Sequence, residues 1–213
     1  MPHPAPAPVP PIERTSRNQV QRGSRRASYD REVINAILDE ALVAHIAALV
    51  EGSVRSQPIY FWRMGGEIHV HGSRRNALFR ALLAGGEACI TVAILDGLVM
   101  ARSAFHHSMN YRSVAVYAKA RAVTDPEERL ASLRQSVERL SPGRWPQIRK
   151  PRAAELNATE ILAFPITEAS AKARSGGPVD DPDDYLMPVW AGEIPARIAF
   201  DPGIEDTNTE PPV

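Results

Sequence analysis

Residues 103–116 read SAFHHSMNYRSVAV, a polar segment that runs directly into an alternating apolar strand. Val114 and Val116 alternate with smaller side chains, which is typical of a strand with one buried face. Because successive side chains of a strand point to opposite faces, we expect Tyr111 and Ser113 on one face and Arg112 on the other. A strand end with so many polar groups indicates a ligand site, and the candidates are His106, His107, Ser108, Asn110, Tyr111, Arg112 and Ser113.

A second group of hydrogen-bond donors, His71–Asn76 (HGSRRN), follows the predicted strand Glu67–His71. Gly72 would let a ligand approach the backbone, and the first amide groups of a helix from Arg75 would add donors. Charge-assisted contacts suited to a phosphate would come from Ser73, Arg74 and Arg75. We expect both groups to meet around one anionic, aromatic ligand, for which a flavin nucleotide is suitable. The alternative is a solvated turn in which Ser73 only caps the helix.

The remaining periodicity predicts a mainly β (α+β) fold, a small closed barrel with peripheral helices. Turns are expected at Val54–Gln57, at Gly65–Gly66 and, as a type I′ hairpin, at Asp96–Gly97, and Ala169–Asp184 reads as an irregular loop. The predicted helices are Tyr29–Ala41, Arg75–Leu83, Asp125–Leu140 and Ala153–Thr159. The predicted strands are Leu42–Val50, Pro58–Met64, Glu67–His71, Ala88–Leu95, Leu98–Ala104, Arg112–Val123, Ile161–Ile166 and Pro188–Ile194.

A length of 213 residues suits one domain with tails. We expect residues 1–28 to be a flexible Pro-rich and basic arm, residues 29–200 to be the folded domain, and residues 201–213 to be an acidic disordered tail. Lys+Arg 25 balances Asp+Glu 25, so no overall charge indicates nucleic acid. The basic arm keeps nucleic-acid binding open as a minor alternative. Neither a secretory signal nor a membrane-spanning segment is evident, and the single Cys89 favours a cytoplasmic location.

Other polar positions have weaker interpretations. Lys172 and Arg174 lie in a Gly-rich segment, and together with Trp190 they could close over an aromatic anion by cation–π contact and stacking. His45, in LVAHIAAL, reads as a core histidine. Adjacent His106 and His107 point opposite ways on a strand and have no further ligand at metal spacing, so no metal site is expected. No nucleophile elbow is present, so the catalytic residues stay unknown.

Four motifs in order, HGSRRN, SMNYRSV, SAKARSGGPVDDPDD and VWAGEIP, resemble those of the pyridoxamine 5′-phosphate oxidase-like flavin-nucleotide-binding proteins. The likeness runs from about Arg14 to Arg197 and is greatest for the branch that includes the nitroimidazole-resistance proteins. It implies a split β-barrel homodimer that holds FMN in two interface clefts. It also implies a reductase or oxidase that acts on a small molecule and whose electrons are carried by the flavin.

The resemblance also implies roles for single residues. The segment Pro58, Ile59, Tyr60 and Phe61 would lie along the isoalloxazine, and Ser73–Arg74–Arg75 matches the family's phosphate-binding Ser-Arg-Lys. Trp190 and Gly192 match a Trp-x-Gly that contacts flavin from the other subunit.

Arg197 lies near the family's substrate-binding arginine, and His71 is placed to contact a small ligand beside the flavin. The His-Asp-Arg that usually accompanies that arginine is absent, because the chain reads PARIAFDP, and this argues against pyridoxamine phosphate oxidation. A non-catalytic protein that stores or senses flavin or haem remains the alternative.

Overall fold

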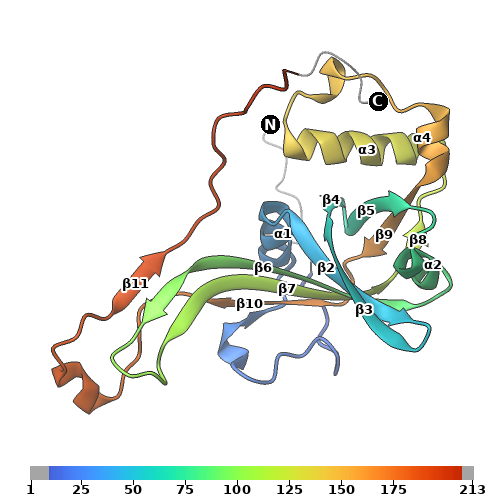
Figure 1. Ribbon diagram of the computed structural model, residues 1–213. Coiled ribbons are helices and arrows are strands. Elements are labelled where there is room, and N and C mark those ends of the chain that lie inside the picture. The colour runs from blue at the N-terminus through green and yellow to red at the C-terminus, as the bar shows by residue number, and fades with distance from the viewer. Residues whose placement is uncertain (1–9, 208–213) are drawn as a thin grey trace, which may run out of the picture. The chain divides into compact units, whose positions relative to one another are not determined.

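The computed structural model describes residues 10–207, which form two β-sheets accompanied by helices (Figure 1). The Pro-rich start and the last six residues of the acidic tail lie outside the described residues. The helices are η1 (Ser24–Arg26), α1 (Arg31–Glu40), α2 (Ala77–Leu83), α3 (Pro126–Leu140), η2 (Trp145–Gln147), α4 (Ala153–Ala158) and η3 (Pro182–Leu186). The strands are β1 (Ala27–Ser28), β2 (Val43–Val50), β3 (Ser53–Tyr60), β4 (Trp62–Met64), β5 (Glu67–Ser73), β6 (Glu87–Met100), β7 (Ser108–Lys119), β8 (Arg121–Ala122), β9 (Thr159–Pro165), β10 (Ala169–Arg174) and β11 (Gly192–Pro195).

Among the described residues, the larger sheet has the order β1–β10–β7–β6–β2–β3, with β11 paired to β6. The smaller sheet has the order β4–β5–β9–β8. Consecutive strands such as β2 and β3 or β4 and β5 are joined by short turns and run antiparallel. This arrangement confirms the mainly β class with peripheral helices.

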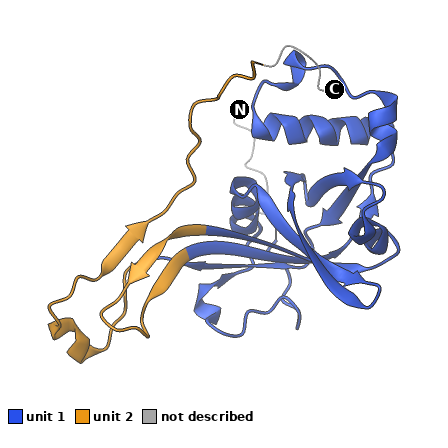
Figure 2. Ribbon diagram, viewed as in Figure 1, with its two compact units in different colours: residues 1–94, 111–175 blue, residues 95–110, 176–213 orange. Residues whose placement is uncertain are grey.

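The chain divides into two compact units (Figure 2). Unit 1 comprises residues 1–94 and 111–175, and unit 2 comprises residues 95–110 and 176–213. The core of unit 1 follows from strand alternation. In β2, for example, Ala44, Ile46, Ala48 and Val50 are buried while the residues between them are wholly or partly exposed. Among the described residues, no helix is long and apolar enough to cross a bilayer.

Residues 10–28, which the sequence leads us to expect as a flexible arm, contain well-packed side chains. Ile12 is 3% exposed and belongs to the core of unit 1. Arg17 forms ion pairs with Glu87 and Glu168. The sequence does not predict this packing, because a single apolar residue such as Ile12 in a polar segment produces no helical or strand periodicity.

The predicted hairpin at Asp96–Gly97 is wrong, because β6 runs unbroken through both residues. Gly97 is needed for a different purpose. A Cβ atom at this position would lie 2.8 Å from the carbonyl oxygen of Ile194 on the paired strand β11. The missing side chain therefore permits close approach of two strands, a common use of glycine within a sheet.

Two further predictions are corrected in the larger sheet. Val54–Gln57 is part of β3 rather than a turn, and the chain reverses at Glu51 and Gly52, where φ is 52° and 77°. Such paired positive φ values suit a two-residue hairpin. The first part of the predicted loop Ala169–Asp184 is strand β10, which pairs with β7.

The chain passes from the larger to the smaller sheet at Phe61, between β3 and β4. The N–H of Phe61 donates to the Leu42 carbonyl, and its own carbonyl accepts from Arg139 at 3.2 Å. The guanidinium of Arg139 lies 4.9 Å from the centre of the buried Phe61 ring. It also donates to the carbonyls of Leu38, at 2.8 Å, and Ala41, which are left unpaired where α1 ends. One side chain of α3 thus fixes α1 and the junction between the sheets.

We predict that Arg139→Met lowers the free energy of unfolding by about 1–3 kcal/mol, because several partly buried carbonyls lose their donor. Chemical denaturation of the full chain measures the effect. Arg134→Met, which removes an exposed arginine of the same helix, is the control. Equal stability of the two variants would contradict the assigned role of Arg139.

Candidate functional site

The turn between β5 and α2 is held by several side-chain hydrogen bonds. Asn76 caps α2, since its Oδ1 accepts from the N–H of Leu78 at 2.9 Å. Its Nδ2 donates to Oε1 of Gln57 on β3 at 2.9 Å. The N–H of Arg75 donates to Ser73 Oγ at 3.1 Å. Asn76 therefore positions the turn rather than offering a free amide to a ligand.

Gly72 has a packing role that differs from the predicted one. A Cβ atom at this position would lie 3.0 Å from the ring of Phe79, which covers the strand from α2. The glycine is needed so that α2 can lie against β5. The predicted contact of a ligand with this backbone stays a prediction.

The two arginines of the turn differ in their partners. Arg74 Nε lies 3.6 Å from a carboxylate oxygen of Glu160 and donates to the Thr159 carbonyl at 3.4 Å, and both contacts are long. The side chain of Arg75 is exposed and has no ion pair with any residue between 10 and 207. Arg75 therefore offers a guanidinium to a phosphate at no cost in internal contacts, and Arg74 offers one at little cost.

His71 precedes this turn and has its ring centre 5.6 Å from that of Trp62. Although the residue is partly solvent-exposed, the surrounding protein lowers the pKa of its imidazole by desolvation. A neutral imidazole at a strand end can accept a hydrogen bond or bind a metal, as the predicted contact with a small ligand requires.

The segment predicted to lie along a flavin ring is divided between two environments. Phe61 is fully buried, and the hydroxyl of Tyr60 donates to the Ser136 carbonyl on α3 at 2.8 Å. These two side chains therefore have structural roles, and a ligand could contact this part of the chain only through its backbone. Pro58 is exposed and Ile59 is partly exposed, so their side chains remain candidates.

The alternation predicted for β7 is confirmed. Val114 and Val116 are buried on the inner face of the strand, and Arg112 lies on the same face. Tyr111 and Ser113 lie on the opposite face. Arg112 forms a bidentate ion pair with the carboxylate of Glu40, at the end of α1. That pair binds the guanidinium to the protein, so a direct phosphate contact by Arg112 would have to displace Glu40.

Strand β10 brings the basic segment beside the donors of β7. Lys172 pairs with Ser113, and Arg174 pairs with Tyr111, in the antiparallel ladder. Ser113 Oγ donates to the Lys172 carbonyl at 3.1 Å. These residues share one sheet, whereas the β5–α2 turn follows a strand of the other sheet.

A pocket of about 440 Å³ lies on the outer face of the larger sheet in unit 1. His45 lines it and is exposed, so its interpretation as a core histidine is wrong. The alternation could have revealed this, because His45 has the phase of exposed Val43 and Leu49, not that of buried Ile46. The pocket is lined by Val20, Val43, His45, Thr91, Val92, Ala93, Ser113, Val114, Ala115, Ser170 and Lys172.

In unit 2, the indole of Trp190 is 64% exposed and precedes β11. A Cβ atom on Gly192 would lie 3.2 Å from this indole, so the glycine makes room for the tryptophan to fold back over the strand. Arg197 is exposed beyond β11. Asn110 is buried, and its Nδ2 donates to Glu193 on β11 at 2.6 Å, whereas Ser108 begins β7 exposed.

The two adjacent histidines of unit 2 are both oriented by backbone carbonyls. His106 Nδ1 lies 2.9 Å from the Val179 carbonyl oxygen, and His107 Nδ1 lies 2.8 Å from that of Ser103. A carbonyl only accepts, so each Nδ1 carries the proton and each Nε2 points away with a lone pair in the neutral ring. Nε2 of His106 lies 3.8 Å from the Asp181 carboxylate, whereas Nε2 of His107 has no hydrogen bond or ion pair with any described residue.

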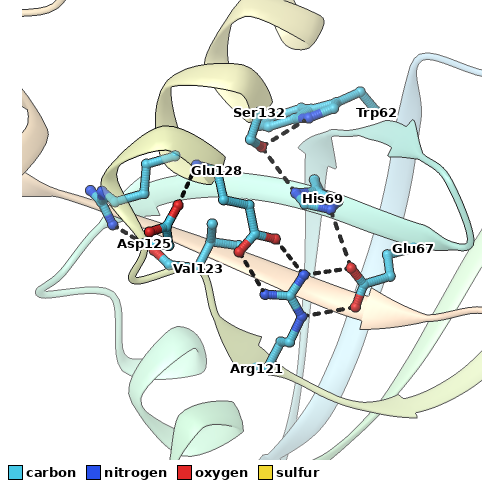
Figure 3. Close-up of polar contacts among 9 residues, drawn as sticks. Trp62, Glu67, His69, Arg121, Val123, Asp125, Glu128 and Ser132 are labelled. Carbon is cyan, nitrogen blue, oxygen red and sulfur yellow. Dashed lines mark hydrogen bonds and ion pairs between the residues drawn. The ribbon is translucent and has the colours of Figure 1, made fainter.

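A polar cluster around the buried His69 and Ser132, which sequence reasoning missed, lies beneath α3 (Figure 3). Ser132 Oγ accepts from Trp62 Nε1 at 3.2 Å and contacts His69 Nδ1 at 2.9 Å. Arg121 bridges the carboxylates of Glu67 and Glu128. Glu67, His69 and Glu128 are close enough together to hold a cation, but Arg121 already neutralises both carboxylates. The cluster fastens α3 to the smaller sheet.

Comparison with known proteins decides the family. The family model described as pyridoxamine 5′-phosphate oxidase matches residues 30–173, well over half of the chain. The chain belongs to the pyridoxamine 5′-phosphate oxidase-like family. Its two sheets with peripheral helices are accordingly the split β-barrel that the motifs predict, and the resemblance drawn from the sequence is confirmed. No curated protein sequence matches the chain.

Among solved structures, the flavocytochrome Anf3 from Azotobacter vinelandii is 40% identical, with 93% of this chain and 92% of that chain covered and a TM-score of 0.87. The FAD and haem binding protein from Mycobacterium smegmatis is 32% identical, with 87% and 91% covered and a TM-score of 0.83. A putative 5-nitroimidazole antibiotic resistance protein from Bacteroides thetaiotaomicron is 17% identical, with 68% and 85% covered and a TM-score of 0.59, and shares the fold.

We predict that the stability of the protein depends on pH through His69 in the polar cluster beneath α3. Burial lowers the pKa of His69, so the folded chain keeps its imidazole neutral. The unfolded chain takes up the proton below about pH 6.5, and the stability that depends on a neutral His69 is therefore lost as the pH falls from 7 towards 5.

Denaturation at pH 7 and pH 5 should show a smaller loss of stability for His69→Gln, which cannot take up a proton, than for the wild type. His45→Gln, an exposed position, serves as the control. An equal loss in the wild type and His69→Gln would exclude the buried imidazole as the cause.

Proposed function

We propose that this chain is a flavin-binding oxidoreductase that exchanges electrons with a small molecule. The observation that carries the proposal is the exposed guanidinium of Arg75, which has no ion pair among the described residues, on the turn after β5 whose motif resembles the family's phosphate-binding Ser-Arg-Lys. Ser73 and Arg74 add a hydroxyl and a second cation. The flavins named for two relatives support the same cofactor class.

The residues of the turn fit the phosphate end of a flavin nucleotide. A phosphate dianion needs charge-assisted donors, and Arg75 and Arg74 can supply them without breaking a short internal ion pair. The bound flavin would supply the redox chemistry, so the chain need only bind, orient and shield it. His71, neutral and next to the turn, is our candidate for contact with the substrate.

In our proposal, a second copy of the chain completes the flavin site. Unit 2 carries many large apolar side chains in solvent, including Phe105, Leu186 and Phe200, which are 80–91% exposed. Side chains of this kind usually mark an interface. We propose a homodimer in which Trp190, Lys172 and Arg174 of one copy close the flavin cleft of the other.

An enzyme reduces and reoxidises its bound flavin repeatedly, whereas a non-catalytic flavin store does not. Anaerobic mixing of the flavin-loaded protein with NADH or NADPH, followed by reoxidation with candidate acceptors, separates them. Reduction and reoxidation over many cycles support an oxidoreductase. A flavin that stays oxidised with both donors supports the store or sensor.

We predict that Arg74→Ala/Arg75→Ala weakens FMN binding about tenfold or more, since each lost charge-assisted contact costs about 1.5–3 kcal/mol. Titration of the cofactor-free protein, followed by flavin fluorescence, measures the dissociation constant. Arg55→Ala/Arg80→Ala removes two other exposed arginines of unit 1 and controls for charge. If both double variants bind FMN as tightly as the wild type, the phosphate lies elsewhere.

Haem binding is the second candidate, favoured by the two relatives described as flavocytochrome and as FAD and haem binding. His107 would hold the haem iron through its Nε2, because its Nδ1–H is held by the Ser103 carbonyl and no described residue hydrogen-bonds its Nε2. Phe105 and Met109, both exposed beside it, could cover a porphyrin face. A bound haem would add one-electron transfer.

For this candidate, haem titration of the purified protein should give a Soret band that His107→Ala lacks and that added imidazole restores. His106→Ala should keep the band, because the Nε2 of His106 faces Asp181. Identical spectra of the wild type and His107→Ala would assign the ligand to another residue.

A further inference from the structure

A basic concavity of about 510 Å³ lies in unit 1, where the segment before β1 folds against β10. We call it the arginine pocket, and it is lined by Arg22, Gly23, Ser24, Arg25, Arg26 and Lys172. Gly23 makes the turn with φ of +70°, which favours glycine. The N–H of Arg26 donates to the Gly23 carbonyl at 2.9 Å, and Lys172 Nζ donates to the Arg22 carbonyl at 3.0 Å.

The position of the pocket is fixed by the sheet. Directly after the turn, Ala27 pairs with Lys172 and Ser28 pairs with Ala171 in the β1–β10 ladder. Lys172 therefore contributes its backbone to the ladder and its ammonium group to the pocket. The cations are held on a paired strand and the turn that leads into it, which lowers the entropy lost when a ligand binds.

The charges of this pocket are not neutralised within the protein. In the described chain, no Asp or Glu forms an ion pair with Arg22, Arg25, Arg26 or Lys172, and none lines the pocket. Arg17, only five residues before Arg22, is by contrast paired with two glutamates. Several cations in one concavity attract a compact polyanion, and guanidinium groups suit phosphate oxygens.

The arginine pocket adjoins a surface that suits a planar ring. Lys172 lines both this pocket and the 440 Å³ pocket on the outer face of the larger sheet. The second pocket is lined by short side chains such as Thr91, Ala93 and Ala115, together with Val43. A largely apolar lining beside a cluster of cations matches an aromatic base joined to a diphosphate.

We propose that these joined pockets bind the ADP moiety of a dinucleotide, with the diphosphate among the arginines and the base on the sheet. The site is separate from the phosphate site proposed at Arg74 and Arg75, so either can fail without the other. Both FAD and NAD(P)H contain this moiety. In the proposed oxidoreductase, the site would bind the ADP moiety of the nicotinamide electron donor. FAD could occupy it only instead of a flavin phosphate at Arg74 and Arg75, because one phosphate of its ADP moiety is the FMN phosphate itself.

The test is the binding of a fluorescent ADP analogue to the full chain at physiological salt, with Arg25→Ala/Arg26→Ala as the variant. We expect saturable binding to the wild type and at least about tenfold weaker binding to the variant, from the loss of two charge-assisted contacts. Arg134→Ala/Lys150→Ala, which removes two cations elsewhere in unit 1, should bind as the wild type does. Unchanged melting temperatures show that the variants fold.

Crossed measurements separate this site from the flavin phosphate site. Arg25→Ala/Arg26→Ala should keep its affinity for FMN, which lacks the ADP moiety, while Arg74→Ala/Arg75→Ala should keep its affinity for ADP. Displacement of the analogue by FAD or by NADPH supports the site and identifies the source of the moiety. The proposal is overturned if the wild type does not bind the analogue, if Arg25→Ala/Arg26→Ala binds it as tightly, or if only a DNA or RNA oligonucleotide displaces it.

Discussion

The guanidinium of Arg139 is the contact on which the arrangement of the candidate site depends. It binds the carbonyl of Phe61, where the chain leaves one sheet for the other, and the carbonyls that end α1. The strands on either side of Phe61 support the β5–α2 turn. Strand β3 supplies Gln57, which anchors Asn76, and β4 pairs with β5, which carries the turn. A shift at Phe61 would therefore move the turn that carries Arg75 relative to Gln57, which holds Asn76 in place.

The distribution of paired and unpaired cations explains how a chain with no net charge can offer anion sites. Arg112 and Arg121 are paired with glutamates, and each pair joins two elements of the fold. Arg75 and the arginine pocket carry cations without such partners. The overall balance of charge hides this separation, because some carboxylates are paired with arginines inside the fold while Arg75 and the arginine pocket have none beside them.

Much of the fold was predictable because strand alternation and helix caps are local signals. Asp30 and Asp125, for example, cap α1 and α3 as their positions suggest. Several of the errors concern glycines and arginines, whose roles depend on distant partners. Gly97 reads as a hairpin residue until β11 is placed beside it, and the packing of Gly72 against Phe79 cannot be read from the sequence.

The candidate site was predictable only in part, for a related reason. The donors of His71–Asn76 follow a strand as expected, but their division into free and occupied groups requires the positions of Gln57 and Glu160. Arg112 illustrates the limit, since nothing in its local sequence indicates the carboxylate of Glu40. The buried cluster around His69 is formed by segments more than 50 residues apart, so no spacing rule could reveal it.

The account rests on a flavin being held by this barrel. The most direct test is the visible absorption spectrum of the freshly purified full chain, with the mass of whatever heat releases from it. We expect the two visible bands of an oxidised flavin and a released mass equal to that of a flavin nucleotide. A colourless protein that takes up neither FMN nor FAD when they are added would contradict the account.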